Sequence, residues 1–459
     1  MATIIETKTD TEANKAKPSR RRELDMMGMV VVMGLVFFHS AQIFTYSDFY
    51  VKNEPPNMEH LSQIVATVFI AFAGLWGMPL MFLIAGIAIF YSLRKRTTAE
   101  FIGERFRRLF IPLVVGTILL VPIQVYIGLK SDPAYDESYG QFLLRFFNVR
   151  LNLDFPRFIS GAPPDELFQT GHLYFLNYLL AFTLLLLPLW LYLKRPEGQR
   201  TARKLVGFLI LPWAIFLLAL PIATIEAALG TEYAGGWNRY AYIPFIIYGF
   251  LMAVDSRMGD TLRREWKKAL LLGVVTLLIY LAGAYMLGPV VQFDAQTDYS
   301  LSHVLFRFLK GLAGWFWVVA VMGMVLHLSH SRAVSKRRSR DPSTGNELDS
   351  PPRTASAKAS FSGRLAQYAG EAQLPFYVLH MTPIVLIGFF VVQWEVNALV
   401  KFLVIVLSAL IVTLLVYDIG VRRTRPTRFL FGLRPSKSHE KAHQPELDGS
   451  EKDAELAQR

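Results

Sequence analysis

The chain has 459 residues, of which 53% are hydrophobic, and it carries a formal net charge of +12. Uncharged runs of about twenty residues recur along it, whereas a soluble domain would spread its apolar residues in periodic stripes. We therefore expect an all-α, polytopic integral membrane protein, whose positive charge reflects basic loops between spans rather than nucleic-acid binding. The lack of cysteine excludes disulfides, thiolate catalysis and Cys-ligated metal sites.

The first apolar stretch follows three arginines and contains one ionisable side chain. Residues 26–44 include no Asp, Glu, Lys or Arg and are about long enough for a helix to cross the hydrocarbon core. They contain His39, and a titratable group at membrane depth usually faces a partner, a cavity or a substrate. Because His39 lies near the far end of the stretch, a histidine that is simply hydrogen-bonded near the membrane surface is the alternative interpretation.

Hydropathy predicts about ten transmembrane helices in one domain over residues 25–420. Residues 1–24 are expected to be a disordered cytoplasmic segment without a signal-peptide cleavage site. The Ser/Pro-rich residues 331–364 are expected to be a flexible cytoplasmic linker, and 421–459 a basic, partly disordered cytoplasmic tail. The predicted spans are 25–45, 62–92, 109–129, 172–193, 205–229, 240–255, 269–289, 311–328, 374–393 and 398–420.

The distribution of Lys and Arg predicts the orientation. With ten spans and a cytoplasmic N-terminus, the cytoplasmic segments hold 39 of the 48 Lys and Arg residues and the outer loops hold 8. This asymmetry favours both termini in the cytoplasm. Trp190, Trp315 and Trp317 are expected in the aromatic belts at the membrane surfaces.

Most other polar side chains of interest lie near predicted span ends, where an interfacial role is the simplest interpretation. Arg105, Arg107 and Arg108 anchor the cytoplasmic side, and as a cluster they could also hold a phosphate-bearing donor, since guanidinium groups match phosphate oxygens. No nucleotide-binding Gly loop, HExxH or GxSxG motif is present. The remaining candidates are Gly86, His172, Glu226, His303, Arg307, His327, Glu371, His380, Glu395 and Asp418.

Five stretches of the chain form a set of motifs in a fixed order. They are LDMMGMVVVMGLVFFHS, MPLMFLIAGIAIFYSLRKR, RFRRLFIPLVVGTILLVPIQVY, GHLYFLNYLL and LPFYVLHMTPIV. Together they resemble the membrane-bound acyltransferase-3 family, with its opening span and late His, its MPLFFLLSG block, its R-x-x-R-L-x-x-P stretch, its GHLWFL motif and its late Tyr-x-x-His. The likeness is nearest to the branch that includes the glucan-modifying protein of periplasmic glucan biosynthesis, a succinyl transferase.

The resemblance implies an acyltransferase of the plasma (inner) membrane. Its donor would be a cytoplasmic acyl-CoA, such as acetyl-CoA or succinyl-CoA, and its acceptor a hydroxyl of a carbohydrate or lipid-linked glycan at the outer face. No bound cofactor, metal ion or nucleic-acid partner is expected. The outer loop at 130–170, rich in Asp, Pro and aromatic residues, is a candidate cover for the acceptor site.

His39 matches the family histidine, and we expect it to be the catalytic base that takes the proton of the acceptor hydroxyl. The family has an arginine eleven residues earlier, where this chain has Gly28. The two positions share a helix face about 16 Å apart. An arginine from another segment, such as Arg105 or Arg108, could occupy the space beside Gly28.

The other matching residues receive binding roles. Arg105 and Arg108 are expected to hold the phosphates of the donor, and His172 and His380 to position the acceptor or the acyl carbonyl. Gly86 would allow close approach of a helix or of the acyl chain, with a packing glycine as the alternative.

Two other function classes stay open. A transporter or flippase of a glycan-linked, lipid-linked or anionic solute could use the same buried His and Arg groups, although the prolines of the spans show no clear repeat. A non-catalytic relative is the third interpretation, because the family arginine is Gly28.

Overall fold

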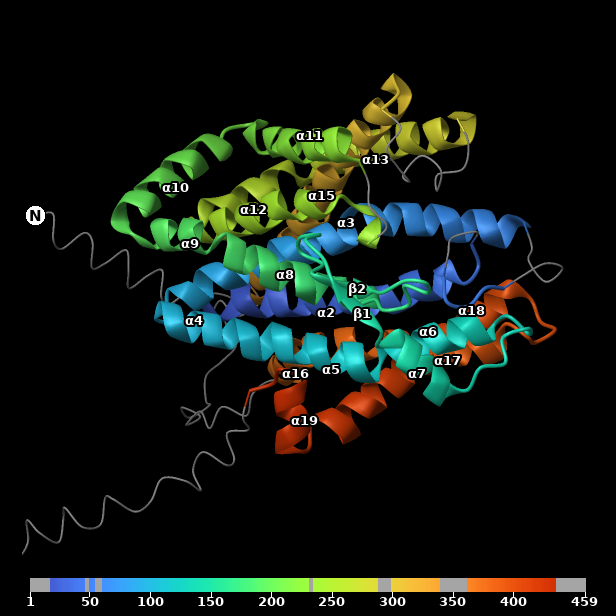
Figure 1. Ribbon diagram of the computed structural model, residues 1–459. Helices are drawn as coiled ribbons and strands as arrows, with labels where there is room; N and C mark the ends of the chain where they lie inside the picture. The colour runs from blue at the N-terminus through green and yellow to red at the C-terminus, as the bar shows by residue number, and fades with distance from the viewer. Residues whose placement is uncertain are drawn as a thin grey trace, which may run out of the picture.

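A computed structural model describes residues 17–45, 49–53, 60–230, 234–287, 299–338 and 361–434. The chain is nearly all α-helical, as its composition predicts (Figure 1). Most of the expected disordered N-terminal segment, linker and tail lies outside the described residues. Their described edges are helical, because the first helix begins at Lys17 and two others reach Arg338 and start at Phe361.

The helices pack side by side, with short turns between most of them (Figure 1). In chain order they are α2 (Lys17–Gln42), α3 (His60–Leu93), α4 (Thr98–Arg105), the π-helical turn η1 (Phe106–Phe110), α5 (Ile111–Leu119), α6 (Val121–Lys130), α7 (Tyr139–Phe146), η2 (Gly171–Leu173), α8 (Tyr174–Leu185), α9 (Leu187–Lys194), α10 (Pro196–Leu209), η3 (Ala214–Leu218), α11 (Ala219–Leu229), η4 (Ala234–Gly236), η5 (Arg239–Ala241), α12 (Tyr242–Val254), α13 (Arg257–Leu287), α15 (Leu301–Arg338), α16 (Phe361–Leu379), α17 (Met381–Val391), α18 (Ala398–Leu415), η6 (Val416–Val421) and α19 (Arg425–Leu430). Between α7 and η2, β1 (Val149–Leu151) and β2 (Ile159–Gly161) form an antiparallel pair.

Within the described ranges, six helices are long and apolar enough to cross a membrane, and up to nine spans result if each of three bent helix pairs counts as one. A further apolar helix, Arg239–Val254, is shorter. Each predicted span falls on one of these segments, but the count of ten stays a prediction. The bent pairs are Gly171–Leu185 with Leu187–Lys194 (56°), Pro196–Leu209 with Ala214–Leu229 (117°), and Gly363–Leu379 with Met381–Val391 (51°).

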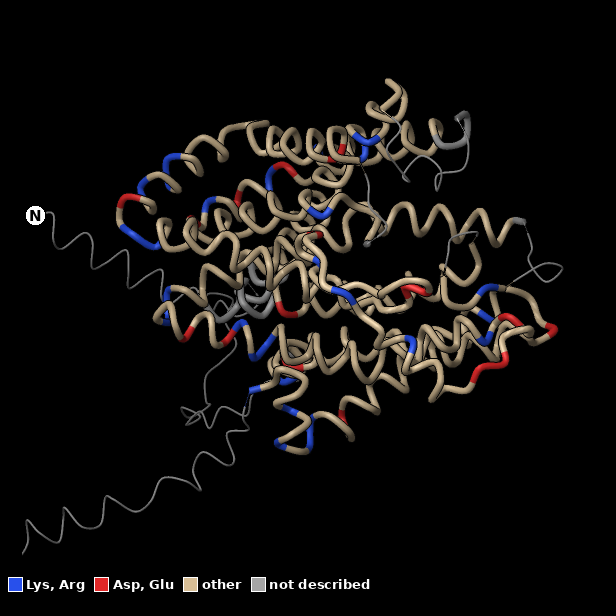
Figure 2. Tube along the Cα trace, viewed as in Figure 1, with Lys and Arg blue, Asp and Glu red and all other residues tan. Residues whose placement is uncertain are grey.

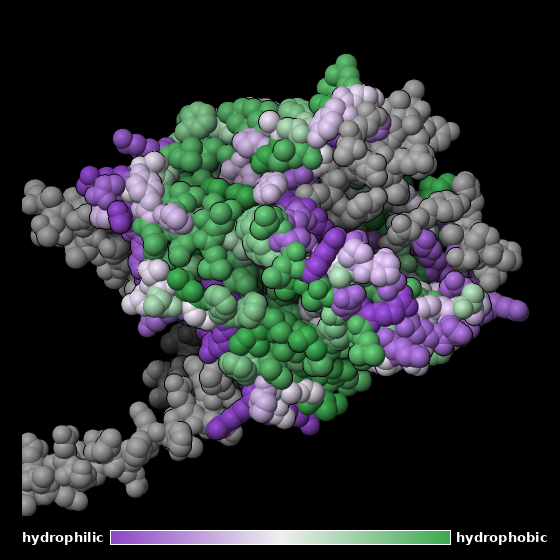
Figure 3. Space-filling model, viewed as in Figure 1, coloured by the Kyte–Doolittle hydropathy of each residue, from purple (hydrophilic) through white to green (hydrophobic). Residues whose placement is uncertain are grey.

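Many charged side chains lie toward the two ends of the helix bundle, and an apolar surface lies between them. The turns α3–α4 and α9–α10 lie at the left end of the bundle in Figure 1, and the turns α6–α7 and α17–α18 lie at the right end. Figure 2 shows Lys and Arg around α4, on α10 and on α19. A broad hydrophobic surface occupies the middle of the molecule in Figure 3, as expected for a protein surrounded by lipid. That the end with α4 faces the cytoplasm stays a prediction.

Three tryptophans that were expected at the membrane surfaces are buried inside the bundle. Trp190 and Trp315 are fully buried, and their indole N–H groups donate to Thr183 O at 3.2 Å and Ile215 O at 2.8 Å. Trp317 is buried as well. Assignment to the membrane-surface belts was wrong, because these rings pack between helices and the first two find a carbonyl partner inside the bundle.

Glycines set the close contact between α3 and α12. A Cβ built at Gly86 would lie 2.0 Å from Ile246 O, and one built at Gly249 would lie 1.9 Å from Leu83 O. Both obstructing atoms belong to the backbone, so they cannot move without separating the helices. The packing alternative therefore accounts for Gly86.

We predict that Gly86→Ala destabilises the protein by about 1–3 kcal/mol, because the added methyl group forces α3 and α12 apart. Thermal unfolding of the full chain in detergent measures this loss. Gly207→Ala in α10 is the matched control, since a Cβ there meets no atom within 4 Å. Equal melting temperatures for Gly86→Ala and wild type would contradict the packing role.

Candidate functional site: a histidine-lined cavity and an arginine cluster

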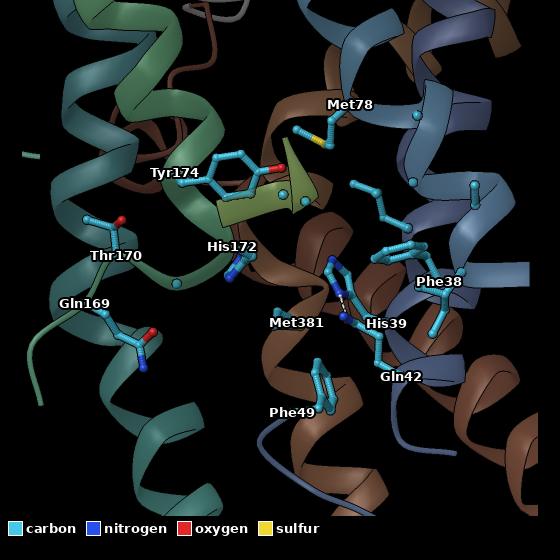
Figure 4. A pocket seen from close by; sticks show the side chains of 18 of the residues that line it. Phe38, His39, Gln42, Phe49, Met78, Gln169, Thr170, His172, Tyr174 and Met381 are labelled. Atoms are coloured by element: carbon cyan, nitrogen blue, oxygen red, sulfur yellow. Dashed lines mark hydrogen bonds between the residues drawn. The ribbon is translucent and has the colours of Figure 1, made fainter. Parts of the chain in front are cut away.

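A cavity of about 2170 Å³ lies among α2, α3, α5 and the start of α8. Most of its walls are apolar, while His39 and His172 bring imidazole rings into it (Figure 4). Residues 147–170, including both β-strands, supply a further wall with several polar side chains. The outer loop expected to cover the acceptor site therefore does border the cavity.

Ionic and hydrogen bonds fix this loop in place. Arg239 contacts the carboxylate of Asp154 and donates to Phe155 O at 2.7 Å. The Asn177 side chain in α8 donates to Pro156 O at 3.1 Å. These contacts tie the turn between β1 and β2 to η5 and α8, so it forms a fixed wall of the cavity.

A second ion pair braces the same loop from outside the cavity. Arg145 Nε lies 2.8 Å from Asp165 Oδ2, and Arg145 Nη1 lies 2.6 Å from Glu137 Oε2. The Arg145 guanidinium holds the pKa of the Asp165 carboxyl below its ordinary value. The ionised pair joins α7 to the segment that leads into η2.

His39 is held in one orientation by its own helix. Its Nδ1 lies 2.7 Å from Gln42 Oε1, one turn further along α2. A carbonyl oxygen only accepts, so Nδ1 carries the proton and Nε2 keeps its lone pair. Phe49 stacks on the imidazole at 6.2 Å between ring centroids, and Phe38 meets it edge-on at 5.2 Å. The described residues form no hydrogen bond to Nε2.

His172 and His380 lie beside His39, although the three come from distant parts of the chain. The His380 ring centroid is 5.4 Å from that of His39 and 5.2 Å from that of His172. His380 Nδ1 donates to Tyr377 O at 2.7 Å, and His172 Nε2 donates to Val378 O at 3.2 Å. His172 Nδ1 and His380 Nε2 are buried without a partner in the described structure.

The cluster therefore presents lone pairs rather than protons. Each of the three histidines donates from one nitrogen to an oxygen and leaves the other nitrogen as an acceptor. A buried acceptor without a donor costs about 1–3 kcal/mol, so a hydroxyl-bearing molecule beside the cluster would relieve this cost. No group of three or more His, Cys, Asp or Glu side chains in the described ranges is arranged to hold a metal ion.

Arg105 and Arg108 lie together, in a group separate from the three histidines. Glu104 Oε1 is 3.0 Å from Arg96 Nη2 and 3.8 Å from Arg108 Nη1. Arg105 is only 9% exposed, its guanidinium lies 4.9 Å from the Phe101 ring centroid, and its Nε has no hydrogen-bond partner. One carboxylate therefore faces a surplus of guanidinium groups.

Arg96, Arg105 and Arg108 form an arginine cluster around Glu104. This arginine cluster adjoins the cavity without lining it. Neither Arg105 nor Arg108 belongs to the cavity wall, and Gly86 does not either. Phe110, two residues after Arg108, is in the wall, as are Leu113 and other residues of α5. Two residues correspond to roughly 3 Å along a helix. The cluster thus stands next to one end of the cavity.

The space beside Gly28 is occupied by an amide. A Cβ built at Gly28 would lie 2.5 Å from Gln373 Nε2, and its three nearest atoms all belong to that side chain. Gln373 comes from α16. The expectation that Arg105 or Arg108 takes this space was wrong, because those side chains lie against Phe101 and Glu104 instead.

Lys310 adds a charged group to the cavity wall that sequence reasoning missed. Its Nζ contacts Gly236 O, lies 3.8 Å from Glu226 Oε2 and is 5.6 Å from the Trp237 ring centroid. Glu226, one of the sequence candidates, is fully buried and also accepts from Asn238 N at 2.6 Å. It therefore acts as a buried counter-ion near the cavity.

Comparison with protein families identifies the family of the chain. A family model described as an acyltransferase domain, acyltransferase-3, matches residues 21–418. The chain belongs to the acyltransferase-3 family. No curated protein and no solved structure matches it. Membership identifies a membrane acyltransferase in general terms, and the match extends from α2 into η6, so that it contains the three histidines and ends before α19.

The contact between Gly28 and Gln373 gives a test of the site's packing. We predict that Gly28→Arg lowers the melting temperature, and that Gln373→Ala in the same chain restores most of the loss by emptying the space. A coupling of about 0.5–3 kcal/mol between the two substitutions is expected for side chains in contact. Gln373→Ala alone is the control, and additive effects would contradict the contact.

Proposed function

We propose that this acyltransferase-3 protein transfers an acyl group from an acyl-CoA donor, such as acetyl-CoA or succinyl-CoA, to a hydroxyl of a carbohydrate or lipid-linked glycan. The donor binds from the cytoplasm at the arginine cluster, and the acceptor enters the cavity from the outer face of the plasma (inner) membrane. A glucan acceptor, as in the branch that the sequence resembles most, is the finer form of this proposal.

The observation that carries the proposal is the fixed orientation of His39. Because Gln42 Oε1 accepts from Nδ1, the Nε2 lone pair is the one available to the cavity. A neutral imidazole held in this way suits general-base chemistry on a hydroxyl group. His39 also stands where the family places its histidine.

The reaction follows from that arrangement. The acceptor oxygen attacks the carbonyl carbon of the thioester while its proton passes to His39 Nε2. The C–S bond breaks, the leaving thiolate takes the proton from His39, and the products are an ester and free CoA. His172, which lines the cavity, accepts a hydrogen bond from a hydroxyl group of the acceptor and so positions the attacking oxygen. His380 does not line the cavity, and it acts from behind the wall by packing against His39 and His172.

The length of the helical segment between the arginine cluster and the cavity wall supports the same route. Arg108 and the wall residue Thr117 are nine residues apart on one helical segment, which corresponds to roughly 14 Å. A donor held by its phosphates at the arginine end can therefore extend its acyl arm along α5 into the cavity. The Nε of the buried Arg105 has no hydrogen-bond partner in the described structure, which supports an anionic ligand there.

We predict that His39→Ala reduces acyl transfer by about 10²- to 10⁴-fold, since the general base is removed. Product ester formed by the purified protein from acetyl-CoA or succinyl-CoA and an oligosaccharide acceptor is the measurement. Donor binding should persist in the variant, because His39 lies outside the arginine cluster. His330→Ala, which alters an exposed histidine outside the cavity wall, is the control. Unchanged product with His39→Ala would refute the assignment.

We predict that Arg105→Gln weakens binding of acetyl-CoA or succinyl-CoA by about 10- to 100-fold, the effect of losing a hydrogen bond to a charged group in a buried setting. Calorimetric titration in neutral detergent measures this change in affinity, with Arg200→Gln at an exposed position of α10 as the control.

The same titration separates the three function classes. A wild-type protein that binds neither thioester would favour a transporter or a non-catalytic relative. Binding that appears only in Gly28→Arg would mean that the family reaction has been lost here and is restored by that arginine.

A further inference from the structure

We infer that the C-terminal segment 422–434, which follows the family-matched region, completes a phosphate-binding site with the arginines of α4 and η1, and that Arg434 contacts the bound phosphate. This inference rests on the proposed function, because the ligand is the phosphate part of the donor. The family match ends at residue 418, so the segment lies outside the matched region.

One arginine organises the segment. Arg428 Nη2 lies 2.5 Å from Glu371 Oε1 in α16. The same side chain donates from Nη1 to Arg422 O at 3.1 Å and from Nη2 to Arg434 O at 2.7 Å. A single guanidinium thus joins both ends of the segment to the membrane domain, and it fixes the backbone from which the Arg434 side chain extends.

The segment also packs closely against the backbone of η1, which carries Arg108 of the arginine cluster. Gly432 has a φ of +70°, and a Cβ built there would lie 3.1 Å from Arg108 O and from side-chain atoms of Leu374 and Pro112. Leu433 is buried next to it. The left-handed conformation and the lack of space both favour glycine at this position. The contact places Arg434 beside η1 rather than free in solvent.

Arg434 is the third arginine whose guanidinium group faces the same carboxylate oxygen. Its Nη2 lies 3.8 Å from Glu104 Oε1, the atom that also faces Arg96 and Arg108. One negative charge cannot neutralise three guanidinium groups, and Arg105 beside them adds a fourth. Like charges this close repel each other, and a ligand with several negative charges relieves that repulsion. Guanidinium groups match phosphate oxygens in geometry as well as charge.

The exposure of Arg434 indicates how such a ligand arrives. Arg434 is 55% exposed, whereas Glu104 is 7% exposed. A phosphate group reaching the cluster from outside the bundle therefore meets Arg434 first and the buried Arg105 last. Phosphate oxygens of this kind belong to a soluble thioester donor or to the headgroup of an anionic phospholipid at the membrane surface.

The test compares Arg434→Gln and Arg434→Glu with wild type in the full chain. Acetyl-CoA is titrated calorimetrically in neutral detergent. Thermal unfolding is measured in phosphatidylcholine nanodiscs with and without phosphatidylglycerol. Arg425→Gln is the matched control, because Arg425 is an exposed arginine of the same segment. Gly432→Ala keeps every charge but displaces the segment.

We expect Arg434→Gln to raise the Kd for acetyl-CoA about three- to fivefold, as for a partly exposed ion pair, and Arg434→Glu to raise it further. Gly432→Ala should act in the same direction, and Arg425→Gln should not. If Arg434 variants instead lose only the stabilisation by phosphatidylglycerol, the site takes lipid phosphates.

Wild-type Kd and wild-type lipid response in both Arg434 variants would overturn the inference. The proposed function would survive that result if Arg105→Gln still lost donor binding. It would fail separately if wild type bound no thioester.

Discussion

In a membrane bundle every buried polar group needs a partner inside the protein, because lipid offers none. The three clustered histidines, of which His39 and His172 line the cavity, meet this requirement with one ring nitrogen each. Gln42 Oε1, Tyr377 O and Val378 O take the three N–H groups, and all three acceptors are carbonyl oxygens. The remaining nitrogens are thereby fixed as acceptors. This constraint explains why the cluster suits a hydroxyl-bearing molecule, which supplies the missing donors.

A related constraint applies to the charged groups next to one end of the cavity. There the surplus consists of positively charged donors, whereas at the histidines it consists of acceptors. Glu104 is the acidic side chain that Arg96, Arg108 and Arg434 share. Burying a guanidinium such as Arg105 without its own carboxylate is costly, so this arrangement is most stable when an anion is bound. Acceptors at the histidines and cations at the arginines thus match the proposed pair of ligands, a hydroxyl compound and a phosphate-bearing thioester.

The sequence could predict elements and single residues better than their contacts. Uncharged runs located the long apolar helices, and His39 is the one ionisable group in the first uncharged run. The contact between Gln373 and Gly28 could not be predicted from the sequence, because it depends on how α16 packs on α2. The tryptophans misled for a related reason, since hydropathy does not reveal whether an aromatic ring faces lipid or another helix. The loop composition indicated an outer cover but not the pairing of β1 with β2.

The link between the two halves of the site is the π-helical turn η1. There the N–H of Ile111 donates to Phe106 O, five residues back, whereas an α-helix uses four. One extra residue rotates all later side chains by about 100° around the axis. From the last residue of η1 onward, Phe110, Leu113 and Thr117 face the cavity, at helical spacings that share one face. Before it, Glu104 and Arg105 face the arginine cluster. A continuous α-helix through 106–110 would turn one of these two faces away, so the irregular turn keeps the arginine cluster and the cavity in line along a single segment.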